Sequence, residues 1–152
     1  MPDPFPITDR FNIRVYGLCI KNNHILMVNE VMNGFEFTKF PGGGLEFGEG
    51  LLECLHREIE EELGLKTTIK EHYYTTEFFQ RSAFKQNEQL LSVYYLIDLP
   101  ECPPMEDFPI INYQSADHRL NFFWRPIKSV QYEEVTFPID KIILEKLKSR
   151  TY

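Results

Sequence analysis

Blocks of apolar residues separated by polar turns fill the first forty positions. Runs rich in β-branched and aromatic side chains predict strands, and they occupy residues 11–20, 25–28 and 35–40. The polar residues 21–24 predict a turn between the first two runs, and the third run leads directly into a glycine turn at 40–44. Three prolines in the first six positions predict an extended lead-in over residues 1–10.

The pattern changes to helical spacing after the glycine turn. From about Glu49 onward, apolar residues recur at steps of three and four, at Leu52, Leu55, Ile59 and Leu63. This is the period of an amphipathic helix that packs one stripe against a core. Gly64 follows the last of these residues and predicts the end of the helix.

Strands and a second helix follow. Residues 66–79 and 90–99 are rich in strand-forming residues, which predicts a hairpin joined by the polar link Gln80–Gln89. Residues 100–119 hold four prolines and no sustained periodicity, which predicts a long ordered loop. The remaining pattern predicts a strand at 120–124 that ends at Pro126, and a helix that Pro138 opens and whose spacing rests on Ile139, Ile142, Ile143 and Leu147.

This order of elements predicts an α+β fold in which helices cover a mixed sheet. The chain has 152 residues, of which 43% are hydrophobic, so we expect one domain over residues 1–152. A net charge of −7 argues against a nucleic acid polymer as partner, because phosphates require a basic surface.

Cysteine content and the N-terminus bear on the compartment. The three cysteines, Cys19, Cys54 and Cys102, have no spacing typical of a disulfide framework or a zinc site, and we expect them to be packing thiols. No secretory signal and no apolar run of about 18 residues is present, so we expect a cytoplasmic protein with no membrane partner.

Three carboxylates at the end of the first helix conflict with helix stability. Glu58, Glu61 and Glu62 stand at i, i+3 and i+4, where like charges repel by about 0.2–0.5 kcal/mol per pair. A solvated acidic face is the ordinary interpretation of such a cluster. A hard divalent cation such as Mg²⁺ would reverse the argument, because it takes carboxylate, carbonyl and phosphate oxygens. The glycine turn favours the metal, because it can bring a bare carbonyl close to the carboxylates.

Arg57 lies beside these carboxylates on the same helix. It stands four residues after Glu53 and four before Glu61, so it can pair along the helix in an ordinary surface ion pair. Alternatively, it can reach back toward Glu49 and orient the ligands.

The residues Gly43, Glu49, Arg57, Glu58, Ile59, Glu61, Glu62, Gly64 and Leu65 fill every fixed position of the Nudix box. The chain therefore resembles the Nudix hydrolases, which cleave diphosphates linked to a nucleoside or a similar group. The resemblance implies a Nudix-like fold, with a central mixed β-sheet flanked by helices in an α/β/α sandwich. It also implies Mg²⁺ or Mn²⁺ held by Glu58, Glu61, Glu62 and the Gly42 carbonyl, with Arg57 and Glu49 as support.

Substrate-binding candidates lie outside the box. Arg14 is a cation in an apolar strand, so it either extends to solvent or faces a ligand. Lys39 lies closest to the glycine turn and is a phosphate-binding candidate, with a solvated strand lysine as the alternative. Arg81 in the polar link is a third candidate. His72, Tyr73 and Tyr74 could reach a base, although aromatic strand residues more often pack in a core.

The general base is less defined by the sequence. Asp117, at the end of the predicted loop, is our candidate, with Glu106 and Glu88 as weaker ones and a surface acid as the alternative for each. His118 adjoins Asp117 and could contact phosphate.

The substrate is expected to be a small nucleoside diphosphate derivative. A nucleoside triphosphate and a nucleotide sugar such as ADP-ribose stay equally open, because no downstream signature of a particular Nudix subfamily is present. The alternative function is a Nudix-like domain that binds a nucleotide or sugar without cleaving it. Such domains usually lack some of the box glutamates, whereas this box is intact. Assembly as a homodimer also stays open.

Overall fold

The computed structural model describes residues 7–150. Its strands are β1 (Arg10–Lys21), β2 (His24–Met32), β3 (Phe35–Lys39), β4 (Gly42–Gly44), β5 (Thr68–Thr75), β6 (Glu88–Asp98), β7 (Ile110–Ser115) and β8 (His118–Pro126). The helices are α1 (Leu51–Leu63) and α2 (Pro138–Lys148), with single 3₁₀ turns at Met105–Asp107, Ile127–Ser129 and Tyr132–Glu134. The first six residues of the predicted lead-in lie outside the described residues, and Arg10 already belongs to β1.

The sheet consists of two halves, which are joined only at the turn end of the β1–β2 hairpin. Its strand order is β5-β6-β1-β2-β8-β7, with β3 added on β2 and β4 on β1. Strand β1 runs parallel to β6, and the other pairings are antiparallel, which confirms the predicted mixed sheet. Strands β1 and β2 pair only at Ile20↔Ile25 and Lys21↔His24. Beyond this point the two halves of the sheet diverge and leave room between them.

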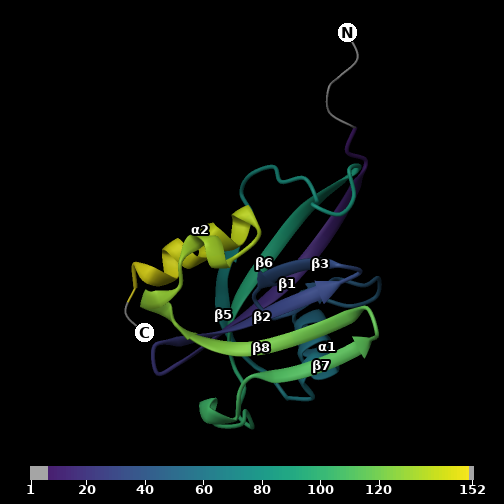
Figure 1. The fold of residues 1–152 in the computed structure, drawn as a ribbon. Helices are drawn as coiled ribbons and strands as arrows, with labels where there is room; N and C mark the ends of the chain where they lie inside the picture. Colours follow the sequence, from purple (N-terminus) through teal and green to yellow (C-terminus); the bar gives the residue numbers. More distant parts are fainter. Residues whose placement is uncertain (1–6, 151–152) are drawn as a thin grey trace.

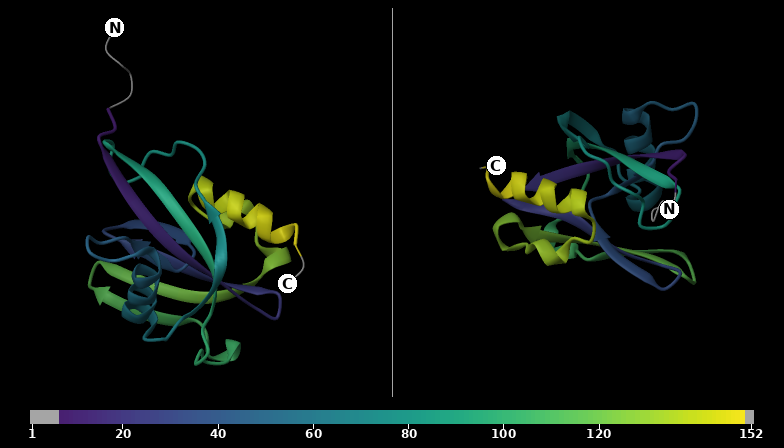
Figure 2. Two further views of the ribbon diagram at one scale, coloured as in Figure 1. Left: turned by 180° about the vertical axis from the view of Figure 1, so that it is seen from behind. Right: turned by 90° about the horizontal axis from the view of Figure 1, so that it is seen from above.

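The two helices cover opposite sides of the sheet (Figures 1 and 2). Helix α2 contributes Ile139, Ile143, Leu144 and Leu147 to one apolar cluster. Helix α1 contributes Cys54, Leu55 and Ile59 to a second cluster. This arrangement confirms the α+β fold with an α/β/α sandwich.

Glycines flank helix α1 at both ends, Gly50 before its first residue and Gly64 after its last. The Gly50 amide donates to the Glu53 carboxylate at 3.2 Å, so Glu53 stabilises the first turn and does not pair with Arg57. Gly64 ends the helix in the left-handed conformation with φ of 67°. The predicted apolar stripe is wrong at Leu52, whose side chain is 46% exposed.

Two sequence expectations need correction. The predicted long loop over 100–119 is wrong, because Ile110–Ser115 forms β7 and pairs with β8. The alternating pattern of this edge strand is short and follows a proline-rich segment, so the pattern does not distinguish the strand from a loop. Strand β2 also continues to Met32, past the predicted end at Val28, because polar Asn29 and Glu30 lie within it.

Other expectations agree with the fold. Strands β5 and β6 form the predicted antiparallel hairpin, and Tyr73 and Tyr74 pack against the α2 cluster. The three cysteines are free, with Cys19 and Cys54 buried as packing thiols. Within residues 7–150, neither helix has the length and apolar character needed to cross a membrane.

Candidate active site

A cavity of about 250 Å³ lies where the two halves of the sheet diverge. Strands β1, β2, β3, β4 and β6 line it, together with the end of α1, the 82–84 segment and the beginning of α2. The cavity therefore collects side chains from most of the fold at one place. Three predicted metal ligands, Gly42, Glu58 and Glu62, are among its lining residues.

The glycine turn is needed for the close approach of α1. A Cβ at Gly43 would lie 2.3 Å from Cδ of Glu58, so a side chain there would displace this carboxylate. Gly42 has φ of +147°, and a Cβ there would lie 2.1 Å from the carbonyl oxygen of Val15. These two glycines bring the backbone of β4 directly against β1 and the Glu58 side chain.

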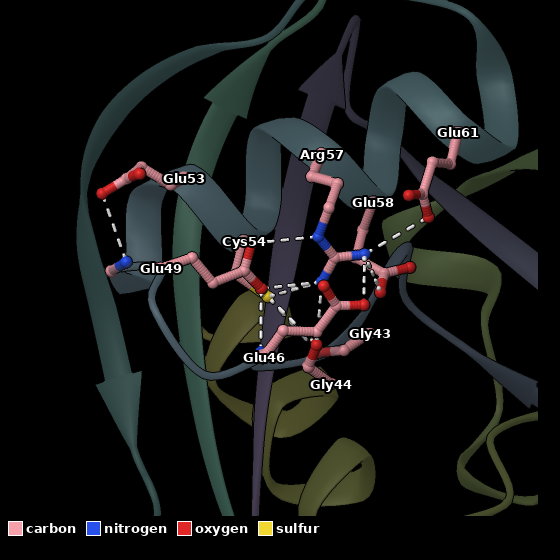
Figure 3. Close-up of polar contacts among 10 residues, drawn as sticks. Gly43, Gly44, Glu46, Glu49, Glu53, Cys54, Arg57, Glu58 and Glu61 are labelled. Atoms are coloured by element: carbon pink, nitrogen blue, oxygen red, sulfur yellow. Dashed lines mark hydrogen bonds and ion pairs between the residues drawn. The ribbon is translucent and has the colours of Figure 1, made fainter.

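Arg57 is the centre of a hydrogen-bond network at this turn (Figure 3). Its Nε and Nη2 donate to the two carboxylate oxygens of Glu49 at 2.9 and 2.7 Å. Its Nη2 also donates to the Gly44 carbonyl at 3.0 Å, and its Nη1 donates to Glu58 at 3.0 Å and Glu61 at 3.2 Å. Both sequence alternatives therefore occur together, because Arg57 pairs along the helix and also reaches Glu49.

The pKa values of this pair follow from their contact. The hydrogen bonds from Arg57, with one from the Glu46 backbone, lower the pKa of Glu49 to about 2. The same contact with Glu49 raises the pKa of Arg57 above its ordinary value. Both groups are therefore fully charged at neutral pH, and the pair ties α1 to the loop that follows the glycine turn.

The three box glutamates differ in their surroundings. Glu58 and Glu62 line the cavity, whereas the Glu61 side chain is 58% exposed and contacts Arg57. Oε2 of Glu62 is buried and has no hydrogen-bond partner. Burial raises the pKa of Glu62 to about 8, with nearby Lys39 opposing this rise and the charges of Glu58 and Glu30 adding to it. A buried carboxylate of this kind is stabilised when a proton or a cation neutralises it.

The residues present fit a hard divalent cation. Within residues 7–150, no three His, Cys, Asp or Glu side chains already stand close enough together to hold a metal ion. Glu58 and Glu62 nevertheless face the same cavity as the Gly42 carbonyl, and oxygen donors of these types are the ones that Mg²⁺ selects. A cation there would satisfy the unpaired oxygen of Glu62.

Lys39 is not the solvated strand lysine that the sequence left open, because it is only 3% exposed. Its Nζ donates to the Gly42 carbonyl at 3.2 Å and lies 3.4 Å from Oε1 of Glu30. Burial lowers its pKa, but Tyr16 and the carboxylates of Glu62 and Glu30 outweigh burial, so the pKa of Lys39 is raised. Lys39 is therefore a charged ammonium inside the cavity.

Arg14 also faces the cavity, which decides between the two sequence alternatives. Its Nε donates to the Tyr16 hydroxyl at 3.1 Å, and the guanidinium lies over the Tyr16 ring. Interaction with Tyr16 outweighs burial and raises the pKa of Arg14, with Glu58 and Glu30 contributing. Two cations, Arg14 and Lys39, thus share one cavity with the acidic end of α1.

Four other candidate residues do not line the cavity. Asp117 lies at the tip of the β7–β8 hairpin and lines a separate depression with His118. Its assignment as the base stays a prediction without support from its position. Arg81 donates to the Gln86 carbonyl within its own loop and lies over the Phe79 ring. Glu88 is buried and accepts from Asn12, and Glu106 is exposed in a 3₁₀ turn.

Several cavity residues were missed by sequence reasoning. Glu30 is buried in β2 and contacts His118 at 2.5 Å as well as Lys39. Asp140 is 1% exposed at the beginning of α2, and Phe37, Phe84 and Phe137 form an aromatic wall. An acid within an otherwise apolar strand or helix face was the available signal for Glu30 and Asp140, because such groups are rarely buried without a partner.

Comparison with known proteins supports the fold and the family. A family model of the NUDIX domain matches residues 10–145. A search of curated proteins finds no significant match. Similar solved structures include a NUDIX hydrolase from Nitrosomonas europaea, with a TM-score of 0.70 and 17% identity over 92% of this chain and 89% of that chain. A MutT NUDIX hydrolase from Burkholderia pseudomallei has a TM-score of 0.70 and 17% identity over 90% and 98%. A UDP-X diphosphatase has a TM-score of 0.63 and 18% identity over 96% and 66%.

Proposed function

Because the chain belongs to the NUDIX domain family, we propose that it is a Mg²⁺- or Mn²⁺-dependent pyrophosphohydrolase acting on a small nucleoside diphosphate derivative. The single observation that carries the metal dependence is the unpaired, buried carboxylate oxygen of Glu62 in a cavity that also contains Glu58. Without a cation, such an oxygen destabilises the fold. Its retention beside a second acid is consistent with a site built for an ion.

The box residues and the Gly42 carbonyl divide into cation ligands and residues that support them. Glu58, Glu61, Glu62 and the Gly42 carbonyl would hold the cation, which when bound would neutralise phosphate charge and lower the pKa of a bound water. The Gly42 carbonyl accepts a hydrogen bond from Lys39, and a carbonyl oxygen has a second lone pair that a cation can use. Arg57 holds Glu49 with two hydrogen bonds and keeps Glu58 turned toward the glycine turn.

The two cations of the cavity are placed to bind the substrate. Arg14 uses its Nε for the Tyr16 hydroxyl, which fixes the guanidinium and leaves its two terminal NH₂ groups for phosphate oxygens. Lys39 donates to Gly42 and approaches Glu30, and an ammonium has a third donor. The two side chains would hold the diphosphate in line with an attacking water.

Two substrate classes fit this proposal. A nucleoside triphosphate and a nucleotide sugar such as ADP-ribose both present a diphosphate on a nucleoside. One similar structure is named as a UDP-X diphosphatase and another as a MutT NUDIX hydrolase, and these names favour neither substrate type over the other.

The test is hydrolysis of a panel of nucleoside triphosphates and nucleotide sugars with and without Mg²⁺. We expect release of nucleoside monophosphate that requires the metal and is abolished in the Glu62→Gln protein. Water labelled with ¹⁸O should place the label on a product phosphate, because attack occurs at phosphorus. Lack of cleavage of every compound, together with binding of one, would favour the non-catalytic binding module.

A further inference from the structure

A second depression, the outer groove, adjoins the catalytic cavity and is not used by the reaction at the box. Its volume is about 550 Å³, and it lies among the beginning of β1, the loop between β4 and α1, and the β5–β6 link. Asn12 and Phe84 line both the outer groove and the cavity. The depression at Asp117, in contrast, shares no lining residue with the cavity. The outer groove is therefore a continuation of the candidate active site.

The cavity by itself is too small for a whole nucleotide. Pockets that enclose a complete small ligand have volumes of about 300–1,000 Å³. The cavity measures about 250 Å³, and the proposed function already places the cation and the diphosphate in it. The nucleoside end of the substrate must then extend beyond the cavity, and the outer groove has a volume within the usual range for a ligand.

The even-numbered positions at the beginning of β1 connect the two spaces. Side chains two residues apart lie on the same face of a strand. Arg14 lines the cavity, Asn12 lines both spaces, and Arg10 lines the outer groove. Asn12 is held at the junction because its amide donates to Glu88 at 3.0 Å. A substrate whose phosphates bind Arg14 can therefore extend past Asn12 into the outer groove.

The outer groove presents phenylalanine rings to solvent. Phe11 of β1, Phe47 of the loop before α1 and Phe84 at the junction all line it, and all three are exposed. Large apolar side chains that gather at one exposed depression indicate a binding site, whereas scattered ones do not. Aromatic side chains of this kind stack on nucleobases, because every base has a π-face. The groove therefore suits a planar ring.

The unpaired charges of the outer groove are positive. Its two acids already have partners, since Glu88 accepts the hydrogen bond at the junction and Glu46 lies 3.7 Å from Arg57. Arg10 and Lys85 are exposed, and among residues 7–150 neither side chain forms an ion pair. In a chain of net charge −7, a local excess of cations attracts an anionic ligand. A nucleotide combines the planar ring and the negative charge that this groove favours.

We propose that the outer groove binds the nucleobase of the substrate against its phenylalanine rings, while Arg10 and Lys85 attract the phosphates toward the cavity. Stacking depends little on the identity of the base, so the groove should accept purines and pyrimidines alike. This inference rests on the proposed function, because it places the base of the same nucleotide substrate.

The first test measures binding without hydrolysis. Titration calorimetry with Mg²⁺ compares GMP, AMP, UMP and CMP with ribose 5-phosphate, which keeps the sugar and the phosphate but lacks the base. We expect each mononucleotide to bind wild type at least about fivefold more tightly than ribose 5-phosphate, and Phe47→Ala to remove most of this difference. Equal affinities of wild type for ribose 5-phosphate and the four mononucleotides would overturn the proposal.

The second test uses the kinetics of the nucleotide that the protein cleaves. Phe47→Ala and Phe11→Ala should each raise KM about 5- to 100-fold with little change in kcat. Unchanged Mg²⁺ dependence would show that the loop that carries Phe47 and Glu49 still supports the cation site. Phe79→Ala removes an exposed phenylalanine that lines neither space, and should keep the wild-type KM. A wild-type KM in both groove variants would mean that the base lies elsewhere.

Charge variants test the attraction of the phosphates. Arg10→Gln and Lys85→Gln should each raise KM severalfold and weaken its dependence on ionic strength, because salt screens the attraction. Lys21→Gln removes the same charge at the opposite end of β1 and should change neither quantity. Equal effects of all three substitutions would mean that only the net charge matters, and the two groove cations would lose their role.

An interface between two copies of the chain is the other occupant that exposed phenylalanines would suit. A wild-type dimer that Phe47→Ala converts to a monomer in sedimentation, with unchanged affinity for the mononucleotides, would overturn the proposal. Mononucleotide binding that requires Phe47, without cleavage of any diphosphate, would keep the groove and remove the proposed enzyme. Mg²⁺-dependent cleavage with a wild-type KM in both phenylalanine variants would keep the enzyme and remove the groove.

Discussion

The two ends of the cavity differ in how far apart their residues lie in the sequence. The acidic end comes from one continuous stretch, Gly43–Leu65, in which a turn and a helix bring Glu58, Glu62 and Arg57 together. The aromatic end, formed by Phe37, Phe84 and Phe137, is assembled from β3, the β5–β6 link and the beginning of α2, which only the folded sheet brings side by side. We therefore expect local spacing to set the reaction class and long-range packing to set which substrate fits. Four variants and their controls test this division.

The largest effects are expected at Glu62. In Glu62→Gln, we expect Mg²⁺-dependent activity to fall by at least about 100-fold, because loss of a ligand should exceed the 10–100-fold effect of removing outer partners. The metal-free protein should become more stable at pH 7 by on the order of 3 kcal/mol, because burial raises the pKa of Glu62 to about 8 and the amide carries no charge. Thermal unfolding of both proteins with and without Mg²⁺ measures the gain in stability and the loss of metal binding.

Glu61→Gln is the control for the stability part of this prediction. Glu61 lies one residue away on the same helix, but its side chain is 58% exposed. Its neutralisation should change the unfolding temperature of the metal-free protein much less. A Glu62→Gln protein that is no more stable than wild type, or that is still stabilised by Mg²⁺, would contradict the assignment.

A smaller loss is expected from Arg57→Lys. The ammonium cannot reproduce the two-point contact with Glu49 or reach the Gly44 carbonyl and Glu58 at the same time. We expect the apparent affinity for Mg²⁺ to fall about 10–100-fold, measured from the metal dependence of hydrolysis.

Arg125→Lys provides a matched control for this change. Arg125 makes the same kind of two-point contact with Glu134, at 3.0 and 2.9 Å, and neither residue lines the cavity. It should leave the metal dependence unchanged. Equal effects of the two substitutions on Mg²⁺ affinity would mean that the Arg57 contact supports only general stability.

The same division explains what could be predicted from the sequence. The box residues and the helix that carries them follow from fixed spacing within one helix, so their proximity could be inferred before folding. Glu30, Asp140 and Phe84 reach the cavity only because β1 and β2 diverge and α2 folds back over the sheet. Strand β7 was missed for a related reason, because an edge strand is defined by its partner β8 more than by its own residues.

At the aromatic end, Phe84→Ala should weaken substrate binding. The Phe84 ring contacts Phe35, Phe37 and Phe137, and its removal opens the aromatic wall. We expect KM to rise about 5- to 100-fold with little change in kcat, in keeping with about 1–3 kcal/mol for stacking on an aromatic side chain. Phe79→Ala is the control, because Phe79 is also exposed in the same link but does not line the cavity. A similar rise in KM for both variants would remove Phe84 from the binding site.

The smallest effect on activity is expected at Asp140, whose contribution is to the pH dependence of stability. Burial raises the pKa of this carboxyl from 3.8 to about 6 in the folded protein. A proton therefore binds the folded state more tightly than the unfolded state, and the stabilisation is fully present below about pH 4 and lost as the pH rises through about 6. A rise of this size corresponds to about 3 kcal/mol, or several degrees in the unfolding temperature of a chain of this length.

The difference between wild type and Asp140→Asn isolates this group, because Glu62 titrates in both proteins and cancels. We expect the variant to lose the decline between pH 4 and 6 in metal-free buffer while keeping the one at higher pH. Parallel unfolding temperatures for the two proteins across this range would mean that Asp140 reaches solvent in the folded state. The carboxylate at the beginning of α2 would then not be the desolvated group that its burial and its contact with Tyr94 imply.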